Sequence, residues 1–394
     1  MRKPFFVILA AALLLICTAA AEKETTYTAD DFIYALLPDG GAELIEYLGD
    51  DGPVVIPNEL DGHPVTAVRG NPFIMYMTYT PLECRVSVAA DHPYLATIDG
   101  VLFGMSDRKL IYYSPLLEAE EYVIPNGIRV IGEQAFASCG RLKSVTIPGS
   151  VTSIGESAFS NCTGLTEVTI PYSVTDLGSY AFSGCYGLTA ATIPDSVTSI
   201  GDGTFFFCSQ LTSVTIPDGM TDIVPYMFYG CGSLTEAVFP DGVRSIGESA
   251  FCDCGSLTEV TIPDGVTSIG DHAFSACGSL TEVTIPDSVR SIGQFAFFRC
   301  GSLTAVTIPE GVTSIGASAF QNCAGLTEVT IPVSVTEIGA HAFDIAENGV
   351  YSPLPNLVFN VRSGSMAEAY CLENGLPHVT SAEHGDRTDW LNAD

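Results

Sequence analysis

A strict period of 23 residues is the feature that most limits what this chain can fold into. An Ile-Pro step recurs at that interval from Ile124-Pro125 to Ile331-Pro332 without insertion, and Phe239-Pro240 replaces it once. The unit reads I-P-x-x-V-T-x-I-G-x-x-A-F-x-x-C-x-x-L-T-x-V-T. One such unit cannot bury its own apolar side, but stacked units share a core. The period therefore predicts a solenoid in which each unit is one coil.

Each coil predicts the same local structure. The stretch L-T-x-V-T-I alternates apolar and β-branched residues and predicts a strand, which the proline ends. The next pair, often Asp-Gly, has turn chemistry, and V-T-x-I predicts a second short extended piece. We expect the following glycine, as at Gly155 or Gly270, to permit a backbone bend. Residues 156–162 are typical of a helical turn that places Phe and Cys in the core.

The repeated strings also resemble a known family. L-T-x-V-T-I-P and I-G-x-x-A-F-x-x-C, as at Leu257–Pro263 and Ile269–Cys277, are similar to the repeats of BspA-like (Treponema pallidum-type) leucine-rich repeat surface proteins over residues 124–343. In the commonest leucine-rich repeat Asn or Cys follows the strand, whereas here Cys precedes the next Leu. The resemblance implies a leucine-rich-repeat horseshoe or rod with a parallel β-sheet and short helical turns on the other side. It also implies an exported, non-catalytic protein active in adhesion or host-protein binding.

Five segments are expected along the chain. Arg2, Lys3, the apolar run 5–16 and the small residues 19–21 predict a signal peptide over 1–21. Residues 22–123 predict an N-terminal cap with a degenerate repeat and a hairpin, 124–343 the solenoid, 344–380 a C-terminal cap with a last strand and a short helix, and 381–394 a polar tail. No segment predicts a membrane span. These features indicate a secreted or cell-surface protein.

Charge and cysteine spacing exclude several classes of function. The chain has 15 Lys and Arg against 46 Asp and Glu, and so acidic a protein is repelled by nucleic acid and anionic lipid. A basic partner or cations fit this charge.

Nine cysteines recur every 23 residues from Cys139 to Cys323, which is not the spacing of a zinc site. We interpret them as buried thiols, with disulfides between coils as the alternative. Cys252, outside this column, is expected to be exposed and reactive.

Two surfaces are candidate binding sites. The first is the solvent side of the strands, where carboxylates and hydroxyls recur: Glu167, Glu236, Glu259, Glu282, Glu328, Thr169, Thr261 and Thr284. The alternative is an ordinary solvated β-surface. The second is an aromatic group expected on the helical-turn side: Tyr180, Tyr226 and Tyr229, with Tyr172, Tyr186, Phe206, Phe295 and Phe298. The alternative is that these rings fill gaps where the coils bend, since Val224-Pro225 interrupts the usual glycine.

Function is therefore predicted to be binding without catalysis. The sequence contains no phosphate-binding loop, dinucleotide fingerprint, nucleophile elbow or zinc helix, and we expect no cofactor and no metal. The Asp and Glu column that follows the Ile-Pro steps is interpreted as turn residues. The expected partner is a protein, such as a host extracellular or cell-surface protein, or a glycan. The alternative is a structural surface-coat or spacer protein with no specific ligand.

Overall fold

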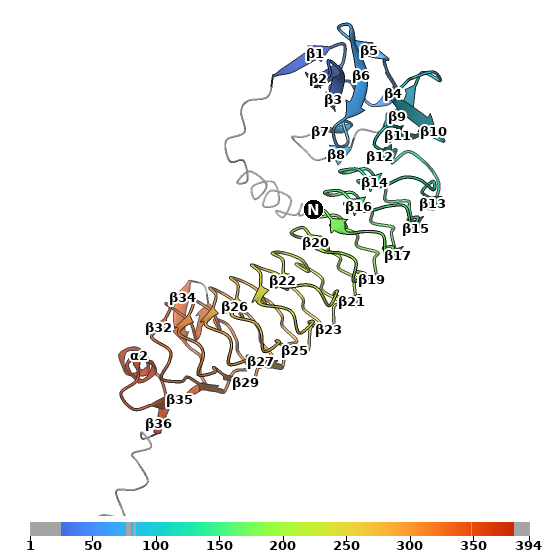
Figure 1. Cartoon of the computed structure of the whole chain (residues 1–394). Coiled ribbons are helices and arrows are strands. Elements are labelled where there is room, and N and C mark those ends of the chain that lie inside the picture. Colours follow the sequence, from blue (N-terminus) through green and yellow to red (C-terminus); the bar gives the residue numbers. More distant parts are fainter. Residues whose placement is uncertain (1–24, 76–79, 82–83, 348, 382–394) are drawn as a thin grey trace, which may run out of the picture.

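The computed structural model describes residues 25–75, 80–81, 84–347 and 349–381, and it shows a rod of stacked coils between two caps (Figure 1). The predicted signal peptide and residues 382–394 of the predicted tail lie outside the described residues. The predicted fold class, a leucine-rich-repeat solenoid of 23-residue coils, is confirmed.

The L-T-x-V-T segments form a ladder of parallel strands, which we call the front ladder. Their central apolar residues, such as Val168 and Val260, are buried, and the residues on either side face solvent. The ladder extends into the C-terminal cap and is paired in three stretches. Its strands are β13 (Glu121–Val123), β15 (Ser144–Thr146), β17 (Glu167–Thr169), β19 (Ala190–Thr192), β21 (Ser213–Thr215); β23 (Glu236–Ala237), β25 (Glu259–Thr261), β27 (Glu282–Thr284); and β29 (Ala305–Thr307), β31 (Glu328–Thr330), β35 (Val358–Arg362), β36 (His378–Ser381).

The V-T-x-I segments form a second parallel ladder, the back ladder, along the other side of the rod (Figure 1). Threonines at the corners of the coils donate to a carbonyl of the preceding coil, as Thr175 does to Thr152 at 3.3 Å, which accounts for their recurrence. The strands are β14 (Val130–Ile131), β16 (Ser153–Ile154), β18 (Asp176–Leu177), β20 (Ser199–Ile200), β22 (Asp222–Ile223), β24 (Ser245–Ile246), β26 (Ser268–Ile269), β28 (Ser291–Ile292), β30 (Ser314–Ile315) and β32 (Glu337–Ile338).

The remaining side of each coil, the turn face, differs from the predicted helical turn. In residues 156–162 the chain makes two successive hydrogen-bonded turns, because Ser157 and Asn161 adopt left-handed φ angles of 52° and 57°. Alternate N–H groups then point to the next coil, and Phe159 donates to Ala181 at 2.7 Å. The turn face is thus a third hydrogen-bonded ladder, which a helix would not allow because its N–H groups bond within the segment.

The recurring glycine of the I-G step lets the backbones of adjacent coils approach closely. It is not needed for the backbone bend that we expected. At Gly155 and Gly270 φ is not positive, but an added Cβ would lie 2.7 Å from backbone atoms of the preceding coil. Gly247 uses this proximity to donate to Ile223 at 2.8 Å. Val224 has a Cβ at the equivalent place, and among the described residues its N–H makes no such bond and β22 does not pair with β20.

A valine at another of these glycines should therefore open the back ladder. In Gly293→Val the Cβ would meet the backbone carbon of Gly270 at 2.5 Å, so the coils must separate. We expect the free energy of unfolding to fall by about 3 kcal/mol, the upper range for overpacking. Urea denaturation followed by circular dichroism measures it. Gly278→Ala, where nothing lies within 4 Å, is the control. Equal midpoints for the two variants would contradict the close-approach explanation.

The core of the rod is built from columns of identical side chains. The rings from Phe136 to Phe343 stack coil upon coil, with centroids 4.8–5.9 Å apart. The leucine column from Leu142 to Leu326 lies beside them, at most 1% exposed. Because every coil contributes the same residues, each slice of core is completed only by its neighbours.

The described cysteines are all free and buried, so the column consists of thiols and not disulfides. Each thiol has a partner in the preceding coil: Sγ of Cys162 lies 3.0 Å from the carbonyl oxygen of Phe136, and the bond recurs along the column. Burial raises the pKa of the Cys231 thiol to about 12. The prediction that Cys252 is exposed is wrong, since it is 8% exposed and lies between Tyr229 and Ser275, to which its side chain hydrogen bonds.

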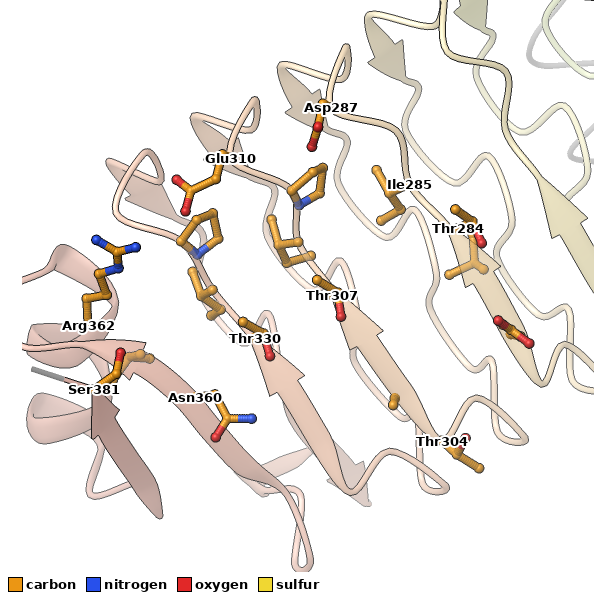
Figure 2. A pocket seen from close by; sticks show the side chains of 18 of the residues that line it. Thr284, Ile285, Asp287, Thr304, Thr307, Glu310, Thr330, Asn360, Arg362 and Ser381 are labelled. Carbon is orange, nitrogen blue, oxygen red and sulfur yellow. The ribbon is translucent and has the colours of Figure 1, made fainter. Parts of the chain in front are cut away.

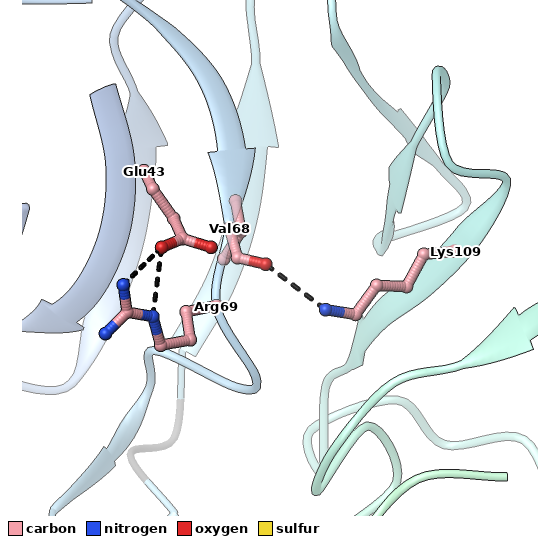
Figure 3. Close-up of polar contacts among 4 residues, drawn as sticks. All are labelled: Glu43, Val68, Arg69 and Lys109. Atoms are coloured by element: carbon pink, nitrogen blue, oxygen red, sulfur yellow. Dashed lines mark hydrogen bonds and ion pairs between the residues drawn. The ribbon is translucent and has the colours of Figure 1, made fainter. Parts of the chain in front are cut away.

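The N-terminal cap has its own core and joins the solenoid through a hairpin, β11 (Val101–Gly104) and β12 (Lys109–Tyr113), and through Nδ2 of Asn71, which donates to the carbonyl of Gln134 at 3.0 Å. Leu102 and Tyr112 face the cap core, whereas Phe103 and Tyr113 face the solenoid core. Nζ of Lys109 donates to the carbonyl of Val68 at 3.3 Å, beside an ion pair of Glu43 and Arg69 (Figure 3). The other cap strands are β1 (Thr26–Ala29), β2 (Phe32–Leu36), β3 (Ala42–Tyr47), β4 (Gly52–Ile56), β5 (Glu59–Leu60), β6 (His63–Val68), β7 (Ile74–Met75), β8 (Thr80–Pro81), β9 (Cys84–Val88) and β10 (Leu95–Ile98).

The C-terminal cap adds a hairpin, β33 (Asp344–Glu347) and β34 (Val350–Pro353), and the helix α2 (Met366–Asn374). The side chain of Ser365 accepts a hydrogen bond from the N–H of Glu368 at 3.1 Å, and Gly375 ends the helix with φ of 64°. Ala367 and Cys371 are buried against the last coil. The helix therefore covers the open end of the core, beside the two long strands β35 and β36.

Candidate functional site

The solvent side of the front ladder, which we call the strand face, carries most of the predicted binding residues. Glu236, Glu259 and Glu282 are exposed and lie in register on β23, β25 and β27. Neighbouring strands are about 4.8 Å apart, so the three carboxylates form a row. In the described part of the chain none of them has an ion pair or a side-chain hydrogen bond. Their charge is therefore available to a partner.

The other predicted strand-face residues are placed less uniformly. Thr261 and Thr284 are exposed beside the glutamate row, at the ends of β25 and β27. Glu167 and Thr169 lie on β17, where the register partners of Glu167 are Ser144 and Ala190, so they are apart from the row. Oε1 of Glu328 accepts a hydrogen bond from the Asn360 amide at 2.6 Å. Five of these eight residues thus lie together on the paired strands β23, β25 and β27, whereas Glu167, Thr169 and Glu328 lie on other strands of the strand face.

A groove of about 770 Å³ opens over the C-terminal end of the strand face. Figure 2 shows Thr284, Thr307 and Thr330 on successive strands, with Asp287 and Glu310 along one rim. Glu282 contributes to its lining, so the groove continues the glutamate row. Asn360, Arg362 and Ser381 complete it from β35 and β36. The site therefore combines hydroxyls, carboxylates and one guanidinium around an apolar floor of Ile285, Ile308 and Ile331.

The residues that complete the groove lie beyond the repeat and were not predicted. Asn360, Arg362 and Ser381 follow the end of the 23-residue period, so no repeat register indicated which strand each would join. Asp287 and Glu310 were interpreted only as turn residues, although their turns also form the rim. The predicted last strand at 357–361 was the signal that could have extended the strand face into the cap.

The predicted aromatic residues lie on a different surface. Tyr180, Tyr226 and Tyr229 are half-buried on the turn face, together with Phe206 and Phe207. Tyr229 stacks on Phe206 at 4.9 Å between centroids, and the hydroxyl of Tyr226 donates to Glu248 at 2.5 Å. Burial, and secondly this hydrogen bond, raise the pKa of Tyr226. Tyr172, expected in this group, instead follows Pro171 in the turn after the front ladder and is 78% exposed.

Metal and membrane chemistry gain no support from the described residues. Within residues 25–75, 80–81, 84–347 and 349–381 we find no group of three or more His, Cys, Asp and Glu side chains placed to hold a metal. In the same part of the chain no helix has the length and apolarity that a membrane crossing requires.

Comparison with known proteins connects this geometry to one family. A family model described as the BspA type leucine-rich repeat region (6 copies) matches residues 111–232 and 221–348. No curated protein matches the chain.

Similar solved structures come from several bacteria. A leucine-rich repeat protein of Eubacterium ventriosum is 23% identical with a TM-score of 0.44, over 63% of this chain and 58% of its own length. The T. pallidum leucine-rich repeat protein is 26% identical with a TM-score of 0.35, over 59% and 91%. A leucine-rich cell surface protein of Faecalibacterium prausnitzii is 24% identical with a TM-score of 0.46, over 89% and 98%.

Proposed function

The chain belongs to the BspA-type leucine-rich repeat family, and on that premise we propose that it is an exported, non-catalytic protein that binds a partner protein through its strand face. Leucine-rich repeat solenoids are generally binding scaffolds without catalytic activity, and proteins of this family are described as surface proteins. Secretion or display at the cell surface, with a role in adhesion, is the setting that we propose for this binding.

The row of Glu236, Glu259 and Glu282 is the observation that supports the proposal best. Three unpaired carboxylates on adjacent strands repel one another, and a basic partner surface relieves that repulsion. The formal charge of −31 attracts such a partner over long range and speeds encounter. The groove next to Glu282 then gives a concave place for a projecting segment of the partner.

Charge reversal on the strand face tests this proposal. Binding of the full chain to a panel of host extracellular proteins and glycans is measured by biolayer interferometry at two salt concentrations. We expect a protein with a basic surface to bind, and the triple variant Glu236→Lys, Glu259→Lys, Glu282→Lys to weaken its affinity by about 100-fold or more, because attraction becomes repulsion.

The matched control reverses three carboxylates of the same coils. Asp218→Lys, Asp241→Lys and Asp264→Lys change the charge equally in the turns after the Ile-Pro or Phe-Pro steps, and we expect at most a few-fold loss from the weaker long-range attraction. Equal affinities of both triple variants would overturn the strand-face proposal. A panel without any bound protein or glycan would favour the structural surface-coat or spacer alternative.

A further inference from the structure

The five half-buried rings on the turn face form one contiguous group, which we call the aromatic cluster: Tyr180, Phe206, Phe207, Tyr226 and Tyr229. They come from three successive coils and touch in sequence, with centroids 4.7–6.4 Å apart. Tyr180, Phe207 and Tyr226 adopt φ angles of 56°, 56° and 57°. Bulky side chains are rarely found in this left-handed region. Several other coils place Ser, Gly or Asn there, whereas His272, Phe295 and Arg299 are further bulky exceptions.

Glycines in the next coil make room for two of these rings. A Cβ on Gly203 would lie 2.3 Å from the ring of Tyr180, and one on Gly230 would lie 2.5 Å from the ring of Phe207. Each ring therefore lies flat over a backbone that carries no side chain. This arrangement spreads the rings across the surface and leaves them partly exposed, where core aromatics such as Phe205 are fully buried.

The repeat itself shows which group such a ring accepts. Phe298 lies three coils beyond Tyr229 and four beyond Phe206, at the same position of the 23-residue unit. There the guanidinium carbon of Arg299 lies 5.0 Å from the centroid of the Phe298 ring. Arg299 in turn occupies the repeat position of Phe207. In the coil of Phe298 the chain supplies its own cation, and in the aromatic cluster that position holds another ring.

The coils that carry the aromatic cluster supply no cation of their own, and the next one along the chain, Arg244, donates to the carbonyl oxygens of Asp241 and Val243 at 3.1 Å. Residues 144–243 contain no Lys, Arg or His, whereas they contain nine Asp and Glu. Carboxylates border the rings, and Glu248 accepts a hydrogen bond from the Tyr226 hydroxyl. Burial is the largest cause of the raised pKa values of Tyr229 and Tyr226. The negative charges of Asp253 near Tyr229 and of Asp202 near Tyr226 raise them further. Ring faces and carboxylates both attract positive charge.

We propose that the aromatic cluster is a second binding site, which takes the guanidinium or ammonium groups of a basic segment of a partner protein. A cation would lie on the exposed face of the Phe206 and Tyr229 rings, as Arg299 lies on Phe298, with Glu248 and Asp253 as counter-charges. Anionic ligands are disfavoured by the same groups. This site lies on the turn face, so it binds whether or not the strand face does.

A labelled peptide of six arginines, titrated with the full chain and followed by fluorescence anisotropy, tests the site. Because any cationic peptide is attracted to so acidic a protein, the variants must hold charge constant. The double variant Phe206→Leu, Tyr229→Leu keeps both charge and apolar bulk, and we expect its affinity to fall by about tenfold. Phe298→Leu, whose ring already holds Arg299, is the matched control and should bind like the unchanged chain.

A second test uses a variant that keeps all but one ring of the aromatic cluster, so its result does not depend on whether the double variant folds. Phe207→Arg should place a guanidinium over Phe206, as Arg299 does over Phe298, and thereby block the site. Ser138→Arg adds the same charge at the same repeat position three coils earlier and should bind about tenfold more tightly than Phe207→Arg.

The site is rejected if the double variant, once shown to be folded, binds the peptide as the unchanged chain does, or if Phe207→Arg and Ser138→Arg bind equally. The site is also rejected if a peptide of six glutamates binds with the same affinity as the peptide of six arginines. The variant Glu236→Lys, Glu259→Lys, Glu282→Lys separates this site from the strand face. When Phe206→Leu and Tyr229→Leu are added to that variant, the affinity for the arginine peptide should still fall.

Discussion

Raising the pH from 7 to about 10 is expected to unfold the solenoid while ionic strength and temperature stay constant. The cause is the column of nine thiols from Cys139 to Cys323. Burial raises the pKa of Cys162, Cys231 and Cys323 from 9.0 to about 12, and it raises the pKa of the other thiols of the column in the same direction. The thiols of the folded state therefore keep their protons at a pH where the thiols of the unfolded chain release them.

The sign and size of the effect follow from proton linkage. Above pH 9 the unfolded chain binds fewer protons than the folded one, so stability falls as pH rises towards the folded pKa values. Each thiol contributes about 1.4 kcal/mol per pH unit, and nine together reach roughly 10 kcal/mol near pH 10, as much as a typical domain's whole stability. Below pH 9 this contribution is fully present. Urea midpoints measured under reducing conditions at pH 7, 8, 9 and 10 check it.

Removal of thiols gives the control for alkaline unfolding. In the triple variant Cys254→Ala, Cys277→Ala, Cys300→Ala we expect lower stability at pH 7, because each alanine loses the Sγ bond to a Phe carbonyl and leaves a small cavity. Its loss of stability between pH 7 and 10 should be smaller by about one third, because three of the nine thiols are gone. An unchanged pH dependence would show that other groups, such as the buried tyrosines, cause the unfolding.

The sequence predicted the coil well, since each coil obeys rules that repeat. Phe159, Leu165 and Val168 were assigned to the core from their register alone, and they are buried. It predicted the turn face less well, because left-handed φ angles at Ser157 and Asn161 depend on hydrogen bonds to the next coil, which a single unit does not contain. The reason for Gly155 was also missed, since a distance between coils leaves no mark within one coil.

The candidate sites could be predicted only where they follow the repeat. Glu236, Glu259 and Glu282 share one register, so their alignment on adjacent strands could be expected from the sequence. Arg362 and Ser381 belong to strands outside the period, and their placement beside Thr330 required the structure. Phe207 was missed in the aromatic cluster because its repeat position usually holds a small or polar residue, such as Asn161 or Gly230.

Phe251→Ala should lower the free energy of unfolding by about 3–5 kcal/mol, the range for a buried phenylalanine truncated to alanine. The ring is fully buried and stacks on Phe228 at 5.2 Å and on Phe274 at 5.4 Å, with Phe239 against its edge at 5.5 Å. Truncation leaves a cavity shared by three coils. The hydrogen bonds between coils, of Phe251 N–H to Ala273 and of Phe228 N–H to Ala250 at 2.8 Å each, keep the coils from closing over it.

Tyr172→Ala is the matched control, because it removes an aromatic ring that is 78% exposed and has no ring partner in the described part of the chain. We expect Tyr172→Ala to change the free energy of unfolding by at most about 0.5 kcal/mol.

Since coils couple through their neighbours, Phe251→Ala should also split unfolding into two steps, with hydrogen exchange fastest in coils 239–284. If exchange instead rose evenly along the rod, the stack would not be a chain of nearest-neighbour contacts but one cooperative block.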